Sequence, residues 1–132
     1  MAQKIGHINI LVKDFDEAIE FYTQKMGFEL LSDKSWGHGQ RWVALAPAGS
    51  HEPKISFSLA DSEQMLARVG SQVGNHILFT IETDDCRRDY ERMRDRGVNF
   101  LGEPQEMFYG TDVIFEDLYG NKFDLIQVSP GF

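Results

Sequence analysis

The chain has 132 residues, a net charge of −8 at pH 7 and an isoelectric point of about 4.9. Because nucleic acids and anionic membranes are bound through clustered Lys and Arg, this acidic balance argues against both as partners. No apolar run is long enough to cross a bilayer, Cys86 is the single cysteine, and residues 5–12 show a strand pattern where a signal peptide would stand. We therefore expect one domain, residues 1–132, in a reducing compartment such as the cytoplasm.

The first half of the sequence predicts a strand, a helix and three further strands. Apolar side chains alternate with others through residues 5–12, as in a strand that buries one face. Apolar residues then recur at helical spacing from Phe15, Asp14 and Glu17 have capping-box spacing, and Gly27 is a natural helix stop. Three more strands are expected at residues 28–31, 40–46 and 54–59, with a loop at 32–39 and a turn at 47–50.

The second half repeats this plan. We expect a first unit at residues 1–60, a linker at 61–74 with a short helix at 61–69, and a second unit at 75–132. In the second unit, strands are expected at 75–81, 98–101, 107–116 and 122–128, with a helix from about Asp84 to Arg96. Because neither unit is large enough to be stable alone, both should share one sheet. The predicted fold is α+β: two βαβββ units that form one curved mixed sheet.

Two histidines occupy similar places in these units. His7 lies in the first expected strand of the first unit, and His76 lies in the first expected strand of the second. Repeats of this length usually indicate duplicated supersecondary units. A histidine at the same place in both units suggests a site built where the units meet.

The alternation along the strands separates a core face from a polar face. The core face is expected to carry Ile8, Ile10, Ile55, Phe57, Ile77, Phe79, Ile81, Phe123 and Leu125. The opposite face is expected to carry His7, Asn9, Ser56, Ser58, His76, Thr80 and Asp124. Polar groups on several strands are not needed for folding, and a curved sheet would gather them into a concave pocket.

The sequence resembles the vicinal oxygen chelate superfamily over nearly its whole length. This superfamily includes glyoxalase I, extradiol dioxygenases, methylmalonyl-CoA epimerase, and the fosfomycin- and bleomycin-resistance proteins. The most specific pieces are residues 7–14, Phe21-Tyr22, Gly27-Phe28 and residues 115–125. The last piece is similar to the family's strand–Asp-Pro-Asp-Gly-Asn–strand ending, with Leu118-Tyr119 in place of Pro-Asp.

The resemblance implies metal ligands at four positions, His7, Ser56, His76 and Asp124. Ser56 stands where glyoxalase I and the epimerase carry Glu or Gln. The chain therefore matches the three-ligand pattern of the dioxygenases and fosfomycin-resistance enzymes, with Asp124 in place of Glu. Two histidines and a carboxylate leave coordination positions open for substrate. The implied cofactor is one divalent metal ion (Fe, Mn, Zn or Ni) bound by His7, His76 and Asp124.

The resemblance leaves two functions open. One is a small metal-dependent enzyme that binds a substrate with vicinal oxygens and stabilises an oxyanion, with a dioxygenase or resistance-type transferase favoured over a true glyoxalase I. The other is a metal-free protein that binds or sequesters a small molecule, like the bleomycin-binding relatives. The residues expected to line the pocket are Asn9, Arg41, Trp42, Ser56, Ser58, Thr80 and Tyr109.

No residue is assigned as a catalytic acid, base or nucleophile. Arg41 either contacts an anionic substrate or pairs with a surface carboxylate. Relatives commonly form homodimers, and a symmetric dimer would cover exposed sheet edges, so we expect a homodimer in which His7 could meet the partner's His76 and Asp124.

Overall fold

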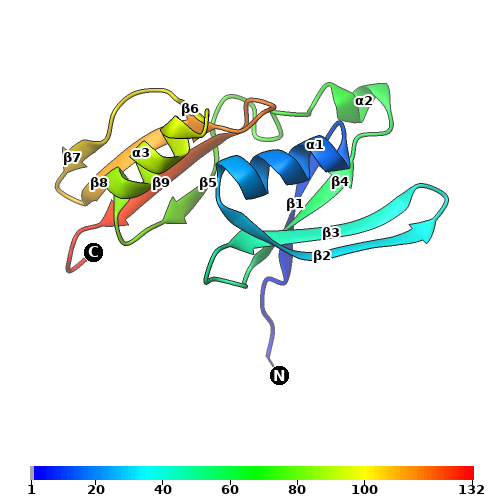
Figure 1. The fold of residues 1–132 in the computed structure, drawn as a ribbon, viewed down its shortest axis with the longest axis horizontal. Helices are drawn as coiled ribbons and strands as arrows, with labels where there is room; N and C mark the ends of the chain where they lie inside the picture. Colours follow the sequence, from blue (N-terminus) through cyan, green and yellow to red (C-terminus); the bar gives the residue numbers. More distant parts are fainter. Residues whose placement is uncertain (1) are drawn as a thin grey trace. The chain divides into compact units, whose positions relative to one another are not determined.

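The structure is a computed structural model that describes residues 2–132 and divides the chain into two compact units, Met1–Val69 and Gly70–Phe132. Each unit contains a mixed β-sheet and a helix that packs against it (Figure 1). The predicted α+β class is confirmed, but the described strands form two sheets, one in each unit, and not the single sheet expected from the sequence. Among the described residues, no helix is both long enough and apolar enough to span a membrane.

The sheet of the first unit has four strands. Their order is β1 (His7–Val12), β4 (Lys54–Leu59), β3 (Gln40–Pro47) and β2 (Phe28–Gly37). β1 and β4 run parallel, and the other neighbours run antiparallel. Between β1 and β2 the chain forms α1 (Phe15–Glu20), which continues into the wider π-helical turn η1 (Phe21–Lys25); the short α2 (Glu63–Leu66) follows β4.

Local sequence signals explain where α1 begins and where η1 ends. The Asp14 side chain accepts a hydrogen bond of 2.9 Å from the backbone N–H of Glu17, which caps the helix. Gly27 follows η1 with a φ of 82°, a conformation that glycine adopts without steric cost. The fully buried Tyr22 then packs edge-on against the rings of Phe28 and Phe57, with centroid distances of 5.6 and 5.0 Å.

The second unit also contains a sheet with a helix packed against it. Its strands lie in the order β5 (Ile77–Glu82), β9 (Lys122–Val128), β8 (Gly110–Glu116) and β6 (Asn99–Phe100), and β7 (Gln105–Met107) also pairs with β8. The helix α3 (Cys86–Asp95) contacts β8 and β9. Asp85 caps it by accepting a hydrogen bond from the Arg88 backbone N–H.

The core of the second unit lies between α3 and its sheet. Phe115, Phe123 and Leu125 are buried on β8 and β9, and Cys86 and Met93 are buried on the helix. The Cys86 thiol lies 3.5 Å from the Leu125 carbonyl oxygen, to which it donates. Burial raises the pKa of this thiol to about 11, so it stays protonated and acts as a small core residue.

Three predicted elements differ from the structure. Residues 32–37 continue β2 instead of forming a loop, because the hairpin with β3 extends to a turn at His38 and Gly39. The strand predicted at 107–116 is divided into β7 and β8 by a turn at Phe108 and Tyr109. The single helix predicted before Gly27 is a short α-helix followed by a π-helical turn.

The start of β5 also differs from the prediction. His76 precedes the strand in a bend instead of lying within it. The register is interrupted at Leu78, since Ile77 pairs with Lys122 whereas Phe79 pairs with Phe123. This irregularity breaks the strict alternation through which the sequence placed Ile77 on the core face. Ile77, Phe79 and Ile81 are half-buried, in contrast to the buried Phe123.

Candidate ligand-binding site

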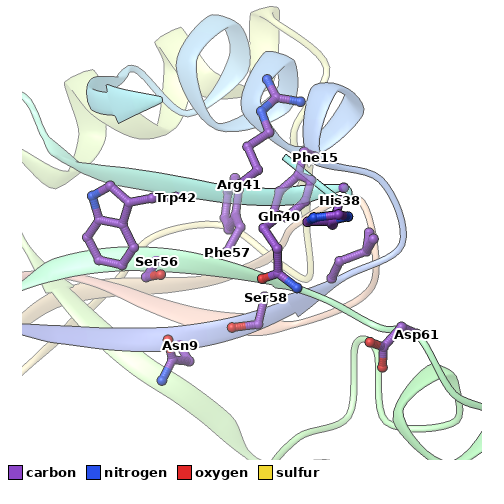
Figure 2. Close-up of a pocket in the computed structure, with 12 residues that line it drawn as sticks. Asn9, Phe15, His38, Gln40, Arg41, Trp42, Ser56, Phe57, Ser58 and Asp61 are labelled. Atoms are coloured by element: carbon purple, nitrogen blue, oxygen red, sulfur yellow. The ribbon is translucent and has the colours of Figure 1, made fainter. Parts of the chain in front are cut away.

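A cavity of about 490 Å³ opens in the first unit where two neighbouring strands diverge. β3 pairs with β4 only through Ala44↔Ser56 and Leu45↔Ile55. Beyond these pairs the two strands separate, and residues from both line the gap (Figure 2). The full lining is Asn9, Phe15, His38, Gly39, Gln40, Arg41, Trp42, Ser56, Phe57, Ser58, Leu59 and Asp61.

The polar side of the cavity comes from side chains on one face of the sheet. The register places Asn9 beside Ser56, and Ser56 beside Ala44 on β3. Ser58 follows on the same face of β4, as the alternation predicts. In Figure 2 Asn9, Ser56 and Ser58 lie near one another, with the indole of Trp42 beside Ser56. This side therefore combines neutral hydrogen-bonding groups with one large aromatic ring.

His7 adjoins this region through Trp42. Its ring meets the Trp42 ring edge-on, with centroids 5.0 Å apart. His7 is exposed, and it is absent from the residues that line the cavity. The imidazole therefore supports the position of the Trp42 indole from the side, an arrangement that aromatic rings favour.

The opposite side of the cavity contains a closed ionic cluster around Arg41. Its guanidinium donates two hydrogen bonds of 2.8 Å to the carboxylate oxygens of Asp33 and one of 2.8 Å to Asp16. It also lies over the Phe15 ring, 5.4 Å from the centroid. The hydrogen bond from Arg41 lowers the pKa of Asp33. Of the two roles considered for Arg41, the structure supports the pair with surface carboxylates.

The second unit carries a separate polar group around Asp124 on β9. The register places Thr80 on one side of Asp124 and Ile114 on the other. One Asp124 carboxylate oxygen is buried and has no hydrogen-bond partner among the described residues. Burial, together with the neighbouring Asp112, raises the pKa of Asp124 to about 6. The Tyr109 hydroxyl donates a hydrogen bond of 3.3 Å to Asp112.

The predicted site residues thus fall into two groups. The cavity of the first unit brings together five of the predicted pocket residues, namely Asn9, Arg41, Trp42, Ser56 and Ser58. Thr80 and Tyr109 belong to the second unit, near Asp124 and Asp112 respectively.

The predicted metal ligands are also divided between the units. His7 belongs to the first unit, whereas His76 and Asp124 belong to the second. His76 is exposed, with Nδ1 3.3 Å from the carbonyl oxygen of Ile77. Among residues 2–132, no group of three His, Cys, Asp or Glu side chains is gathered in the way that a metal ion requires. Binding of a metal by His7, His76 and Asp124 stays a prediction.

Several residues of these sites were not predicted. Phe15, Gln40 and Asp61 line the cavity from the ends of elements, where alternation gives no guidance. Asp112 lies next to Asp124 because β8 and β9 are antiparallel neighbours. The even spacing of Asp112 and Ile114 along β8 was a usable signal, since Ile114 pairs with Asp124.

Comparison with known proteins identifies the family. Residues 4–125 match the Glyoxalase/Bleomycin resistance protein/Dioxygenase superfamily. The chain belongs to this superfamily. A protein of Shewanella frigidimarina with no assigned function is 41% identical over 130 residues, which are 98% of this chain and 96% of that protein. This superfamily is the one that the sequence resemblance indicated.

Two further members of the superfamily have names that describe a function. A probable lactoylglutathione lyase of Synechocystis is 31% identical over 126 residues, 93% of this chain and 94% of the lyase. The crystal structure of TnmS3, an antibiotic binding protein from Streptomyces sp. CB03234, superimposes with a TM-score of 0.76 at 31% identity, and covers 97% of this chain and 98% of TnmS3. Because one relative is named a probable lyase and the other a binding protein, membership of the superfamily alone does not decide the function.

Proposed function

We propose that this protein binds a small, aromatic, oxygen-rich molecule in the cavity of its first unit and sequesters it without chemical change. The observation that carries the proposal is the composition of the cavity wall. Trp42 supplies an aromatic face, and Asn9, Ser56 and Ser58 supply neutral donors and acceptors. Its volume of about 490 Å³ is in the usual range for small-molecule sites.

The cavity suits binding better than catalysis. An activated serine needs a base within hydrogen-bond reach. In the described part of the chain, neither Ser56 nor Ser58 is hydrogen-bonded to a histidine or a carboxylate, and His38 lies exposed on the turn between β2 and β3. The hydroxyls and the Asn9 amide are suited to the carbonyl and hydroxyl groups of a ligand, while the Trp42 ring is suited to its flat apolar part.

The similarity to TnmS3 adds support for a binding function. TnmS3 is an antibiotic binding protein that matches nearly the whole of this chain. The family resemblance also allows sequestration without turnover. We therefore place the ligand among aromatic molecules that carry several oxygens.

A thermal-shift screen of hydroxylated quinones and polyketide-like aromatics tests the proposal. A ligand at about 100 times its dissociation constant stabilises the folded chain by about 2.7 kcal/mol, which raises the melting temperature by several degrees. The replacement Trp42→Ala should abolish this gain. Trp36→Ala is the matched control, because Trp36 is 63% exposed and does not line the cavity. Equal responses of both variants would contradict the proposal.

A second function, metal-dependent chemistry, is favoured by one observation in the second unit. Asp124 has a buried carboxylate oxygen without a partner and lies against a second carboxylate, Asp112. A cation beside the free oxygen would satisfy it and relieve the repulsion between the two carboxylates, which supports a divalent ion at Asp124. Such an ion would polarise a substrate oxygen. Asp124 would hold it together with the predicted ligands His7 and His76, while the Tyr109 hydroxyl orients Asp112.

A further inference from the structure

The cavity carries more negative than positive charge, although an arginine lines it. Arg41 contributes one positive charge, and Asp16 and Asp33 both bind it directly. Asp61 adds a further carboxylate to the lining. This residue is exposed, and in the described part of the chain it forms no ion pair or hydrogen bond. One guanidinium is therefore surrounded by more negative than positive charge.

Most of the hydrogen-bonding capacity of Arg41 is already used by neighbouring carboxylates. Three hydrogen bonds of 2.8 Å use three of its five N–H donors, and the Phe15 ring covers one face of its guanidinium. Figure 2 shows its side chain extending away from Asn9, Ser56 and Ser58. An anion would reach only the remaining N–H donors, and it would lie beside two carboxylates that already bind the same guanidinium.

We propose that the cavity selects cationic aromatic ligands and rejects anionic ones, and that Asp61 is the residue that determines this specificity. The inference rests on the proposed binding function and adds the charge of the ligand to it. Asp61 would attract a protonated amine at one edge of the cavity, while the Trp42 ring at the other end would stack on the flat part of the same ligand. The net charge of −8 acts in the same direction over longer distances.

The charge of the expected ligand distinguishes this chain from relatives named for lactoylglutathione. Glutathione adducts carry carboxylates, and the arginine that lines this cavity is already paired with two carboxylates. The expected ligand is a flat aromatic with hydroxyl or carbonyl groups and one basic amine. Asp16 and Asp33 are positioning residues in this account, since they hold the Arg41 side chain away from the ligand.

Three probes with one aromatic core test the inference. Doxorubicin is a hydroxyanthraquinone with a protonated amine, its N-acetyl derivative is neutral, and its N-succinyl derivative is anionic. Binding is followed by probe fluorescence with the full chain at low salt and again at high salt. We expect doxorubicin to bind about tenfold more tightly than the succinyl derivative at low salt, and the difference to shrink at high salt, because each exposed charge contributes a few-fold and is screened.

Single-residue variants show which side chains cause the preference for a positively charged ligand. Asp61→Asn should weaken doxorubicin binding about threefold and leave the neutral derivative unchanged, an effect typical of one exposed charge. The matched control is Glu91→Gln, which changes the net charge equally on α3 of the other unit. Asp16→Asn combined with Asp33→Asn should release Arg41 and strengthen binding of the succinyl derivative.

The possible results distinguish the two proposals. Equal affinity for all three probes, or no effect of Asp61→Asn on doxorubicin, would overturn the charge inference and leave the aromatic-binding function intact. Failure of all three probes to bind would overturn the aromatic-binding function and the inference with it. A preference for the succinyl derivative would show that Arg41 is available to anions after all.

Discussion

The buried carboxylate of Asp124 should make the stability of the chain depend on pH in a defined direction. Its pKa is raised from 3.8 to about 6, first by burial and then by Asp112. The folded chain therefore holds a proton that the unfolded chain releases near pH 4. The stabilisation is fully present below about pH 4 and is lost as the pH rises through about 6. Above that pH, folding must bury an ionised group beside a like charge.

The size of this effect follows from the pKa difference. One pKa unit corresponds to about 1.4 kcal/mol, so the ionised form costs about 3 kcal/mol at most. Asp124 is only half-buried, and solvent screening reduces the expected cost to about 1–2 kcal/mol. Asp124→Asn removes the charge and keeps the shape, and the new amide can donate to Asp112. We therefore expect the variant to be about 1–2 kcal/mol more stable than the native chain at pH 8, with a smaller difference at pH 4.

Urea unfolding from pH 4 to pH 8, in buffers with a chelator, measures this difference. The matched control is Asp95→Asn on α3, where the side chain is 74% exposed. The control should leave the shape of the pH profile unchanged. Parallel profiles for the native chain and Asp124→Asn, or a variant that is less stable at pH 8, would refute the reasoning.

Three further predictions concern the metal, the assembly and Ser56. Elemental analysis of untagged protein should find about one divalent ion per chain. His76→Ala should lose this ion, because the two remaining ligands bind it weakly. Full metal occupancy in both His7→Ala and His76→Ala would contradict the prediction. Light scattering should give about twice the chain mass of 15.1 kDa, and a monomer at micromolar concentration would exclude a stable homodimer. Ser56→Glu should tighten metal binding. The native chain should show little isomerisation of the methylglyoxal–glutathione adduct, and rapid turnover of this adduct would restore the glyoxalase interpretation.

The strand faces were predictable because they depend only on alternation. Asn9, Ser56 and Ser58 line one cavity, as the sequence placed them on one face, and Phe57 is buried on the other. Parallel pairing of β1 with β4 places Asn9 beside Ser56, a register that alternation alone does not give. Fold class followed from the repeated order of strand and helix and from the family resemblance.

The cavity and the ionic cluster could not be read from the sequence. The gap between β3 and β4 depends on where their ladder stops, and the residues around Gln40 and Ser58 contain no signal for that point. The partners of Arg41 come from α1 and β2, so they are set by packing of distant segments. The start of β5 likewise depends on pairing with β9. The ladder begins at Ile77↔Lys122, so the placement of His76 within the strand was wrong.

Fluorescence of single-tryptophan variants tests most directly whether an aromatic ligand binds in the cavity beside Trp42. Trp36→Phe leaves Trp42 at the cavity, and Trp42→Phe leaves the exposed Trp36. Each variant is titrated with a hydroxyanthraquinone that the thermal-shift screen identifies as a ligand. A ligand in the cavity should quench Trp42 in a saturable way at one site per chain and leave Trp36 nearly unchanged. Saturable quenching of Trp36 alone, or equal and non-saturable quenching of both, would contradict binding in this cavity.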